Sequence, residues 1–235
     1  MSGRLFSVLG LAAALAVGPL SSAHGAEAAA LPTTESGWKT YFKELDRSKD
    51  AQSYFTLGSF YAAGHPQLTR SGKPDADKAF DYYEKAAELG HPEAQYRLGY
   101  CYENKLGLRR ANLELAQMWY RKAADQEVPA AQLRVGQLFF DDKGAFYDRK
   151  LAFYYLSKAA ERGLPEAQRM AGDCHKLGWG TDRNYVKALT WYILAAAQED
   201  EKARNSRDTV IEIYHLNKDD IRAAEKAARE FQPKL

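Results

Sequence analysis

The sequence predicts an all-α protein that folds as an α-solenoid, a stack of antiparallel helix hairpins. Two observations lead to this prediction. A skeleton of small and aromatic residues recurs about four times, and both halves of each copy have the apolar spacing of a helix. A recurrence of about 20–50 residues is typical of solenoids, whose single units cannot bury their apolar face alone and therefore stack on their neighbours.

The skeleton consists of an alanine and a Leu-Gly pair in the first half of the copy, and of an alanine, an aromatic pair, a lysine and Ala-Ala in the second half, with departures at Val135, Ala171 and Leu194. The glycine recurs in steps of 41, 37 and 36 residues, at Gly58, Gly99, Gly136 and Gly172. The second-half alanine recurs in steps of 37, 36 and 36 residues, at Ala79, Ala116, Ala152 and Ala188. The small residues predict that the two helices of a hairpin approach each other closely, with the aromatic side chain filling the space between hairpins.

The second half of each copy carries signals for the start and the end of a helix. Four residues before each second-half alanine stands a residue that can accept hydrogen bonds from first-turn amides: Asp75, Asn112, Asp148 or Asn184. A proline follows the first three of these helices and is predicted to end them: Pro92, Pro129 and Pro165. The repeats are therefore placed at residues 51–93, 94–130, 131–166 and 167–202.

Both flanks of the repeats are predicted to cap the stack. Residues 26–50 are expected to hold a leader and an amphipathic helix that Ser36 caps and that acts as a half-repeat. Residues 203–235 are expected to form two further helices, the last one capped by Asp219 and ending before Pro233. The longer first-repeat loop at 64–74 is read as a neutral insertion, with contact to a partner as the alternative.

The first 25 residues have the features of a secretory signal peptide. Arg4 precedes an apolar run of 13 residues, Leu5 to Val17, and Ala23-His24-Gly25 offers small residues for cleavage after Gly25. An uncleaved anchor is the alternative. No later segment is long and apolar enough to cross a bilayer. The protein is therefore expected in the periplasm or outside the cell, with no membrane span after cleavage.

Composition argues against a nucleic-acid partner and against a disulfide. With a formal net charge of +2, the chain lacks the surplus of basic residues that a nucleic-acid-binding protein has. Cys101 and Cys174 occupy equivalent positions two repeats apart, which predicts a separation on the order of 20 Å between their Cα atoms. A disulfide requires less than about 7 Å, so both are expected to be buried free thiols.

No arrangement of side chains in the sequence indicates catalysis. Cys174 and His175 are adjacent, and on a helix adjacent side chains point about 100° apart, which suits neither a nucleophile–base pair nor a zinc site. His65 and His91 each precede a proline in a turn and have no partner at metal-ligand spacing. Phosphate-binding and calcium-binding loop motifs are missing from the sequence. We therefore expect no enzyme, no cofactor and no metal.

The repeat resembles the Sel-one-like repeat (SLR) family, a relative of the tetratricopeptide repeat with a longer loop between helices. The resemblance covers roughly residues 51–203, and Val135, Ala171 and Leu194 depart from its pattern. The matching segments are AQYRLGYCY (94–102), LAQMWYRKAA (115–124), LGWGTDRNYVKALTWY (177–192) and PEAQ, which occurs at 92–95 and 165–168. The resemblance implies a right-handed superhelix whose first helices line a concave, partner-binding face.

The resemblance also implies which side chains line that face. They stand three residues before, one after and four after each repeat glycine. The set is Phe55, Ser59, Ala62, Tyr96, Tyr100, Glu103, Leu133, Gln137, Phe140, Arg169, Asp173 and Lys176. The groove is expected to be aromatic and apolar in its first and middle parts and charged toward repeat four. The alternative for some of the rings is a place in the core.

The preferred function is an extracytoplasmic adaptor, a monomer that binds another envelope or secreted protein in this groove. By resemblance, such a protein could regulate an envelope sensor or an assembly process. A binding protein for cell-wall fragments or glycans is the alternative, with the tyrosines stacking on sugars. A β-lactamase-like enzyme is a third possibility. Two observations argue against it: no Ser-x-x-Lys motif stands out in a catalytic setting, and the chain lacks the cysteine framework of the secreted relatives that have been linked to β-lactams.

Overall fold

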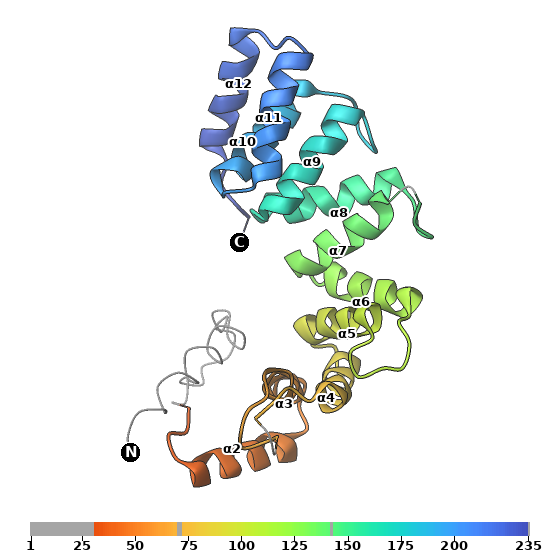
Figure 1. Cartoon of the computed structure of the whole chain (residues 1–235), viewed down its shortest axis with the longest axis vertical. Coiled ribbons are helices and arrows are strands. Elements are labelled where there is room, and N and C mark those ends of the chain that lie inside the picture. The colour runs from red at the N-terminus through yellow and green to blue at the C-terminus, as the bar shows by residue number, and fades with distance from the viewer. Residues whose placement is uncertain (1–30, 70–71, 142, 235) are drawn as a thin grey trace. The chain divides into compact units, whose positions relative to one another are not determined.

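The computed structural model describes residues 31–69, 72–141 and 143–234, and every regular element in them is a helix (Figure 1). The helices are α2 (Glu35–Ser48), α3 (Ala51–Ala63), α4 (Ala76–Glu88), α5 (Pro92–Asn104), α6 (Leu113–Asp125), α7 (Pro129–Phe140), α8 (Arg149–Glu161), α9 (Pro165–Leu177), α10 (Tyr185–Ala197), α11 (Glu201–Ile213) and α12 (Lys218–Glu230). The structure confirms the predicted α-solenoid of helix hairpins. The predicted signal peptide lies outside the described residues.

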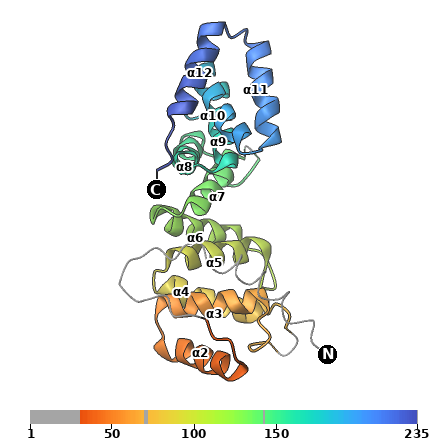
Figure 2. The same cartoon turned by 90° about the vertical axis from the view of Figure 1, so that its left-hand side faces the viewer.

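The chain divides into two compact units, Met1–Trp119 and Tyr120–Leu235, with the division inside α6. In the first unit, α2 packs on α3, α3 on α4 and α4 on α5. In the second unit, α7 packs on α8, α8 on α9 and α9 on α10, and both α11 and α12 pack on α10 (Figure 2). Within each unit, therefore, these consecutive helices pack side by side, except that α12 packs on α10 and not on α11.

The repeat glycines allow the close approach of first and second helices that the sequence predicts. A Cβ atom on Gly58 would lie 2.8 Å from the ring of Tyr83, and one on Gly172 would lie 2.6 Å from the ring of Tyr192. At Gly136 the neighbour is Leu156, at 2.7 Å. All three distances are shorter than a carbon–carbon contact allows, so only glycine fits.

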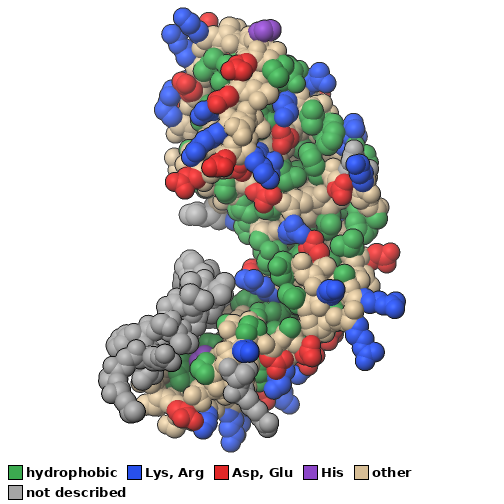
Figure 3. Space-filling model, viewed as in Figure 1, with side chains coloured by type: hydrophobic (Ala, Val, Ile, Leu, Met, Phe, Trp, Pro, Cys, Tyr) green, Lys and Arg blue, Asp and Glu red, His purple; other side chains and the backbone are tan. Residues whose placement is uncertain are grey.

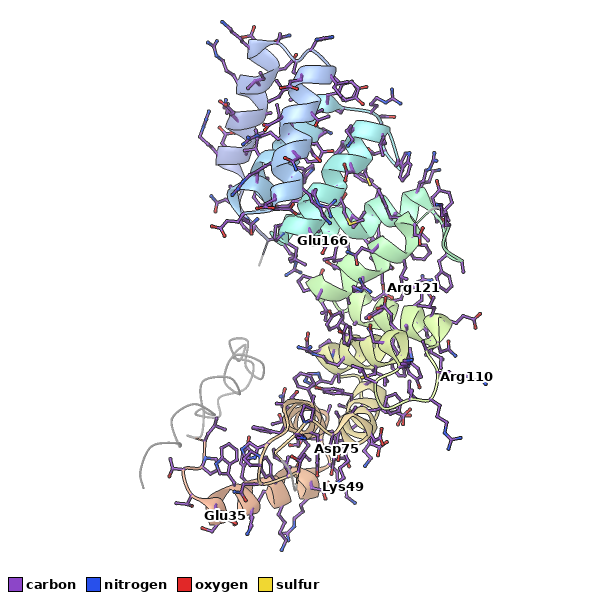
Figure 4. The ribbon with its side chains drawn as sticks, viewed as in Figure 1. Glu35, Lys49, Asp75, Arg110, Arg121 and Glu166 are labelled. Atoms are coloured by element: carbon purple, nitrogen blue, oxygen red, sulfur yellow. The ribbon has the colours of Figure 1, made fainter. Side chains whose placement is uncertain are left out.

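The predicted helix starts are confirmed, but the role assigned to the prolines is wrong. Asp75, for example, accepts a hydrogen bond from the Lys78 amide at the start of α4 (Figure 4). Equivalent bonds are made by Asn112, Asp148 and Asn184. Pro92, Pro129 and Pro165 are instead the first residues of α5, α7 and α9. A proline fits the first helical turn because no intrahelical acceptor awaits its missing N–H.

A buried glutamine joins each of three hairpins to the next helix. The Nε2 atom of Gln95 donates to the carbonyl of Ala87 at 3.2 Å, near the end of α4. The equivalent bonds run from Gln132 to Ala124 at 3.4 Å and from Gln168 to Ala160 at 3.3 Å. Each of these carbonyls lies at a helix end and also accepts from a turn amide, that of Gly90, Glu127 or Gly163, so the glutamine adds a second hydrogen bond there.

The N-terminal helix α2 follows the register of a second helix of a repeat. The Tyr82 hydroxyl of α4 donates to Asp46 of α2 at 3.0 Å, just as Tyr155 of α8 donates to Asp125 of α6 at 3.3 Å. In this bond α2 occupies the place of a second helix; its predicted role in capping the stack stays a prediction. The predicted cap is wrong: Thr34, not Ser36, accepts the first-turn hydrogen bond, from the Gly37 amide, because the helix already begins at Glu35.

The last two helices, α11 and α12, both pack on α10. Asn217, and not the predicted Asp219, caps α12, because Asn217 and Asp220 form a reciprocal capping box. After α12, the Phe231 ring meets the Trp191 ring edge-on at 5.6 Å between centroids, and the Lys234 amide donates to the Glu161 carbonyl at 2.8 Å. The described helices include none with the length and apolar character of a membrane span.

Candidate interaction surface

All twelve residues of the predicted groove lie on the first helices α3, α5, α7 and α9, and all are partly or fully exposed. The residue directly before the repeat glycine is buried instead, as at Leu57, Leu98 and Val135. The spacing rule therefore selected a solvent-accessible stripe in each unit. Whether a partner binds to that stripe stays a prediction.

In the first unit the stripe is aromatic. The Phe55 ring of α3 stacks on the His91 ring at the start of α5, with centroids 4.4 Å apart. Tyr96 and Tyr100 follow on one side of α5, and Tyr100 is 42% exposed. Phe55, His91, Tyr96 and Tyr100 are called the aromatic face below. α3 contains no acidic or basic residue, whereas α5 carries Glu93, Arg97 and Glu103 beside its tyrosines.

Sequence reasoning missed the role of His91. Its Nδ1 atom accepts a hydrogen bond from the Ala94 amide at 3.2 Å, which makes His91 the N-cap of α5. Its Nε2 atom lies 3.2 Å from Oε1 of Gln52 on α3. The sequence feature that indicates this cap is a polar residue directly before Pro92, since a proline often stands at the first position of a helix.

In the second unit the stripe is a network of paired charges. The Arg169 guanidinium lies 3.5 Å from Asp173 and 3.4 Å from Asp200, and its side chain is 16% exposed. Asp173 also accepts from Lys176 at 2.9 Å and from the Tyr192 hydroxyl at 2.8 Å. Burial, and then the Asp173 charge, raise the pKa of Tyr192, so the phenol remains a donor. The charges predicted for repeat four are thus largely compensated within the unit.

The same network connects neighbouring first helices. Gln137 on α7 donates to Glu166 at the start of α9 at 3.0 Å (Figure 4). Asp200, which pairs with Arg169 of α9, is the N-cap of α11. Acidic and basic side chains are also interspersed over α11 and α12 on the face that Figure 3 presents. Leu133, by contrast, packs against buried alanines of α8 and α9.

Phe140 contacts a neighbouring loop. Its ring lies 4.9 Å from that of Trp179, and the Arg149 guanidinium lies 4.7 Å from the Trp179 ring. The loop passes so close that a Cβ on Gly180, which has a φ of +72°, would lie 2.1 Å from the Arg149 carbonyl oxygen. In the sequence, the feature that corresponds to this contact is the Trp-Gly pair within LGWGTDRN, which sequence reasoning did not use to predict the contact.

The two cysteines are free and buried. Burial raises the pKa of Cys101 to about 11 and that of Cys174 to about 12, so neither thiol ionises readily at neutral pH. The His175 ring meets Phe153 edge-on at 5.2 Å, as Tyr102 meets Phe80 at 5.5 Å in the first unit. His175 therefore occupies the place of a packing aromatic residue.

Comparison with known proteins agrees with this architecture. The sequence model of the Sel1 repeat family matches residues 51–91, 92–128, 129–164 and 165–200. Over 140 residues the chain is 34% identical to the chitin synthase regulator SKT5 of Saccharomyces cerevisiae, covering 57% of this chain and 20% of that protein. Over 132 residues it is 39% identical to the DAP3-binding cell death enhancer 1 of Rattus norvegicus, covering 55% and 25%. The chain thus spans only about a fifth to a quarter of these relatives.

Solved structures show the same fold. A Sel1 repeat protein from Oxalobacter formigenes superposes with a TM-score of 0.66 at 27% identity, covering 84% of this chain and 80% of that one. The protective antigen c5321 of uropathogenic Escherichia coli, which has an SLR fold, gives a TM-score of 0.51 at 22% identity, covering 85% and 49%. Sel1 repeats generally mediate protein–protein interaction. By its four matched repeats, the chain belongs to the Sel1 repeat family.

Proposed function

We propose that this protein is an extracytoplasmic adaptor that binds a protein or peptide partner on the first helices of its repeats. The observation that carries the proposal is the aromatic face, on which Tyr100 is 42% exposed beside Tyr96 and the Phe55–His91 stack. Exposed aromatic side chains with a polar surround are typical anchors of protein interfaces. The low charge of α3 favours apolar and aromatic side chains of the partner over acidic or basic ones.

The location is part of the proposal and rests on the sequence. Residues 1–25 combine a basic start, an apolar run and a small-residue cleavage site. Cell fractionation of the full chain tests this, with Gly25→Arg to block cleavage as the comparison. Mature protein that begins at Ala26 in the extracytoplasmic fraction supports the location. Unprocessed protein that stays inside the cell contradicts it.

Site-specific photo-crosslinking tests the interaction. A photoreactive residue at position 100 is expected to give one discrete protein adduct in living cells, which Tyr96→Ala weakens. Tyr154 is the matched control, because it is 50% exposed and lies on a second helix. An adduct that forms equally from position 154, or that survives Tyr96→Ala unchanged, argues against the aromatic face. Protection of position 100 by cell-wall fragments instead of protein supports the glycan alternative.

A further inference from the structure

His91 joins two first helices on the aromatic face. Nδ1 accepts from the Ala94 amide at the start of α5, Nε2 lies 3.2 Å from Oε1 of Gln52 on α3, and the ring stacks on Phe55 at an interplanar angle of 20°. One imidazole therefore caps α5 and connects it to α3.

These contacts determine the protonation state of the ring. A backbone N–H can only donate, so Nδ1 must keep its lone pair toward Ala94. The single proton of the neutral ring is then on Nε2 and donates to Gln52. The orientation of Gln52 agrees, because its Nε2 atom donates to the Thr56 hydroxyl at 3.3 Å and leaves Oε1 for His91. The arrangement needs the neutral Nε2–H tautomer.

We infer that His91 is a proton-operated latch between α3 and α5, whose role in regulating partner binding rests on the proposed function. Protonation places a hydrogen on Nδ1, which then faces the Ala94 N–H donor. The cap of α5 is lost, whereas the bond to Gln52 remains. The new positive charge also stands at the positive end of the α5 dipole. The first turn of α5 consequently loosens beside Phe55, and the aromatic face changes.

Among the described residues, no acidic side chain forms an ion pair with His91, and the shift of its pKa comes from burial and a backbone hydrogen bond, with no neighbouring carboxylate among its causes. From α4 the ring of Tyr83 lies 6.0 Å from Phe55, and α3 contributes only tyrosines among its titratable groups. On α5, the Glu93 carboxylate lies 3.5 Å from Arg97. Burial lowers the pKa of His91. At neutral pH the ring is therefore uncharged and the latch holds, with the Ala94 amide bonded to Nδ1. This bond begins to be lost as the pH falls below the ordinary histidine pKa of about 6.5.

The equivalent positions in the chain show that a titratable cap is specific to this repeat. The N-caps of the first helices among the described residues are Asp50, His91, Val128, Leu164 and Asp200. Val128 and Leu164 make no side-chain cap bond, and the other two N-caps are aspartates. Of the residue types at these five positions, histidine is the one whose ordinary pKa lies between pH 5 and 8.

Nuclear magnetic resonance on the full chain tests the latch without a partner. Ring nitrogen spectra at pH 7.5 are expected to show the Nε2–H tautomer of His91. Between pH 7.5 and 5, protection of the Ala94 amide from hydrogen exchange, corrected for intrinsic rates, is expected to fall about fivefold, the size of one lost N-cap bond. His91→Asn retains a cap acceptor without titrating, so Ala94 is expected to stay protected at both pH values.

A second variant separates titration from general loosening. Gln52→Glu places a carboxylate beside Nε2, which favours the charged ring and is expected to shift the His91 titration to higher pH. An Nδ1–H tautomer, equal protection of Ala94 at both pH values in the natural protein, or an unchanged pH dependence in His91→Asn each overturns the latch. Repeating the position-100 crosslink at both pH values then reports separately on the partner, so the proposed function can fail while the latch holds.

Discussion

Gly172 lies directly against the ring of Tyr192, so close that a Cβ atom would stand 2.6 Å from Cε1. The contact joins α9 to α10, and Tyr192 is fully buried. Tyr192 is also fixed by its hydroxyl, which donates to Asp173. The ring therefore cannot move aside without breaking a hydrogen bond.

Gly172→Ala is consequently expected to lower the free energy of unfolding of the second unit by about 1–3 kcal/mol, the usual cost of overpacking. Urea unfolding followed by circular dichroism measures this. The double variant with Tyr192→Ala is expected to lose less than the sum of the two single losses, because the smaller side chain makes room. If the loss of the double variant equals the sum of the two single losses, the Gly172–Tyr192 contact is not the cause of the destabilisation.

The repeat period was sufficient to predict the fold, because spacing alone determines which residues share a helix face. The caps Asp75 and Asn184 followed from residue type at a fixed distance from the repeat alanine. The prolines were misread because Pro92 can stand either just after one helix or at the start of the next, and only the turn geometry decides. Gly90 takes a φ of +89° in that turn, which ends α4 and leaves Pro92 to begin α5.

The candidate surface was predictable only in part, for a similar reason. Spacing from the repeat glycine selected positions that are exposed, such as Tyr100, or partly exposed, such as Lys176. The Arg169–Asp200 pair depends on how two helices are rotated against each other, which one sequence does not reveal. The bond between His91 and Gln52 depends in the same way on the approach of another helix, whereas the capping of α5 by His91 is local.

Gln168 offers a test of the buried glutamines. It donates to the Ala160 carbonyl and accepts from Nε2 of Gln198 at 3.0 Å. Gln168→Ala removes both bonds, although the Ala160 carbonyl still accepts from the Gly163 amide and Gln198 still donates to the Gly163 carbonyl. A loss of about 1–3 kcal/mol in the free energy of unfolding is expected for the two bonds together. Gln232→Ala is the matched control on an exposed residue, for which no measurable change is expected. Equal effects of the two variants would contradict a structural role for the glutamine.

His175 predicts a pH dependence of the second unit. Burial lowers its pKa, Lys187 lowers it further, and a bond to the Asp182 backbone acts in the opposite direction. The unfolded chain binds the proton at about pH 6.5 and the folded chain only at lower pH, so protonation favours unfolding. The stabilisation that His175 gives the second unit is therefore complete above about pH 6.5, and it declines as the pH falls toward the lowered pKa of the folded state.

His175→Phe is expected to remove this decline for the second unit, because an aromatic ring fits the place that Tyr102 fills in the first. Hydrogen exchange of α9 and α10 at pH 7.5 and 5.0 measures it. His215→Phe, on an exposed histidine, serves as the control and is expected to leave the decline in place. If the protection of α9 and α10 in His175→Phe falls between pH 7.5 and 5.0 as much as in the natural protein, another titrating group causes the pH dependence.

The raised pKa values of Cys101 and Cys174 predict slow alkylation. At pH 8, where a free thiol is partly ionised, iodoacetamide is expected to modify neither residue in the folded protein and both in urea. Mass spectrometry of the intact chain and of its peptides gives the extent at each site. Rapid labelling of Cys174 in the folded protein would mean that the thiol is accessible and ionised, contrary to its burial.

The tail after α12 is expected to stabilise the end of the second unit mainly through its aromatic residue. Phe231 meets the Trp191 ring, whereas the Lys234–Glu161 ion pair at 2.5 Å joins an exposed lysine to a glutamate whose side chain is 39% exposed. Exposed ion pairs contribute about 0–1 kcal/mol, and an aromatic contact adds to the apolar area that it buries. Phe231→Ala should therefore lower the melting temperature more than Lys234→Ala, and should shift tryptophan emission to longer wavelength as Trp191 becomes hydrated. The reverse order would indicate that the backbone and ion-pair contacts to Glu161 hold the tail instead.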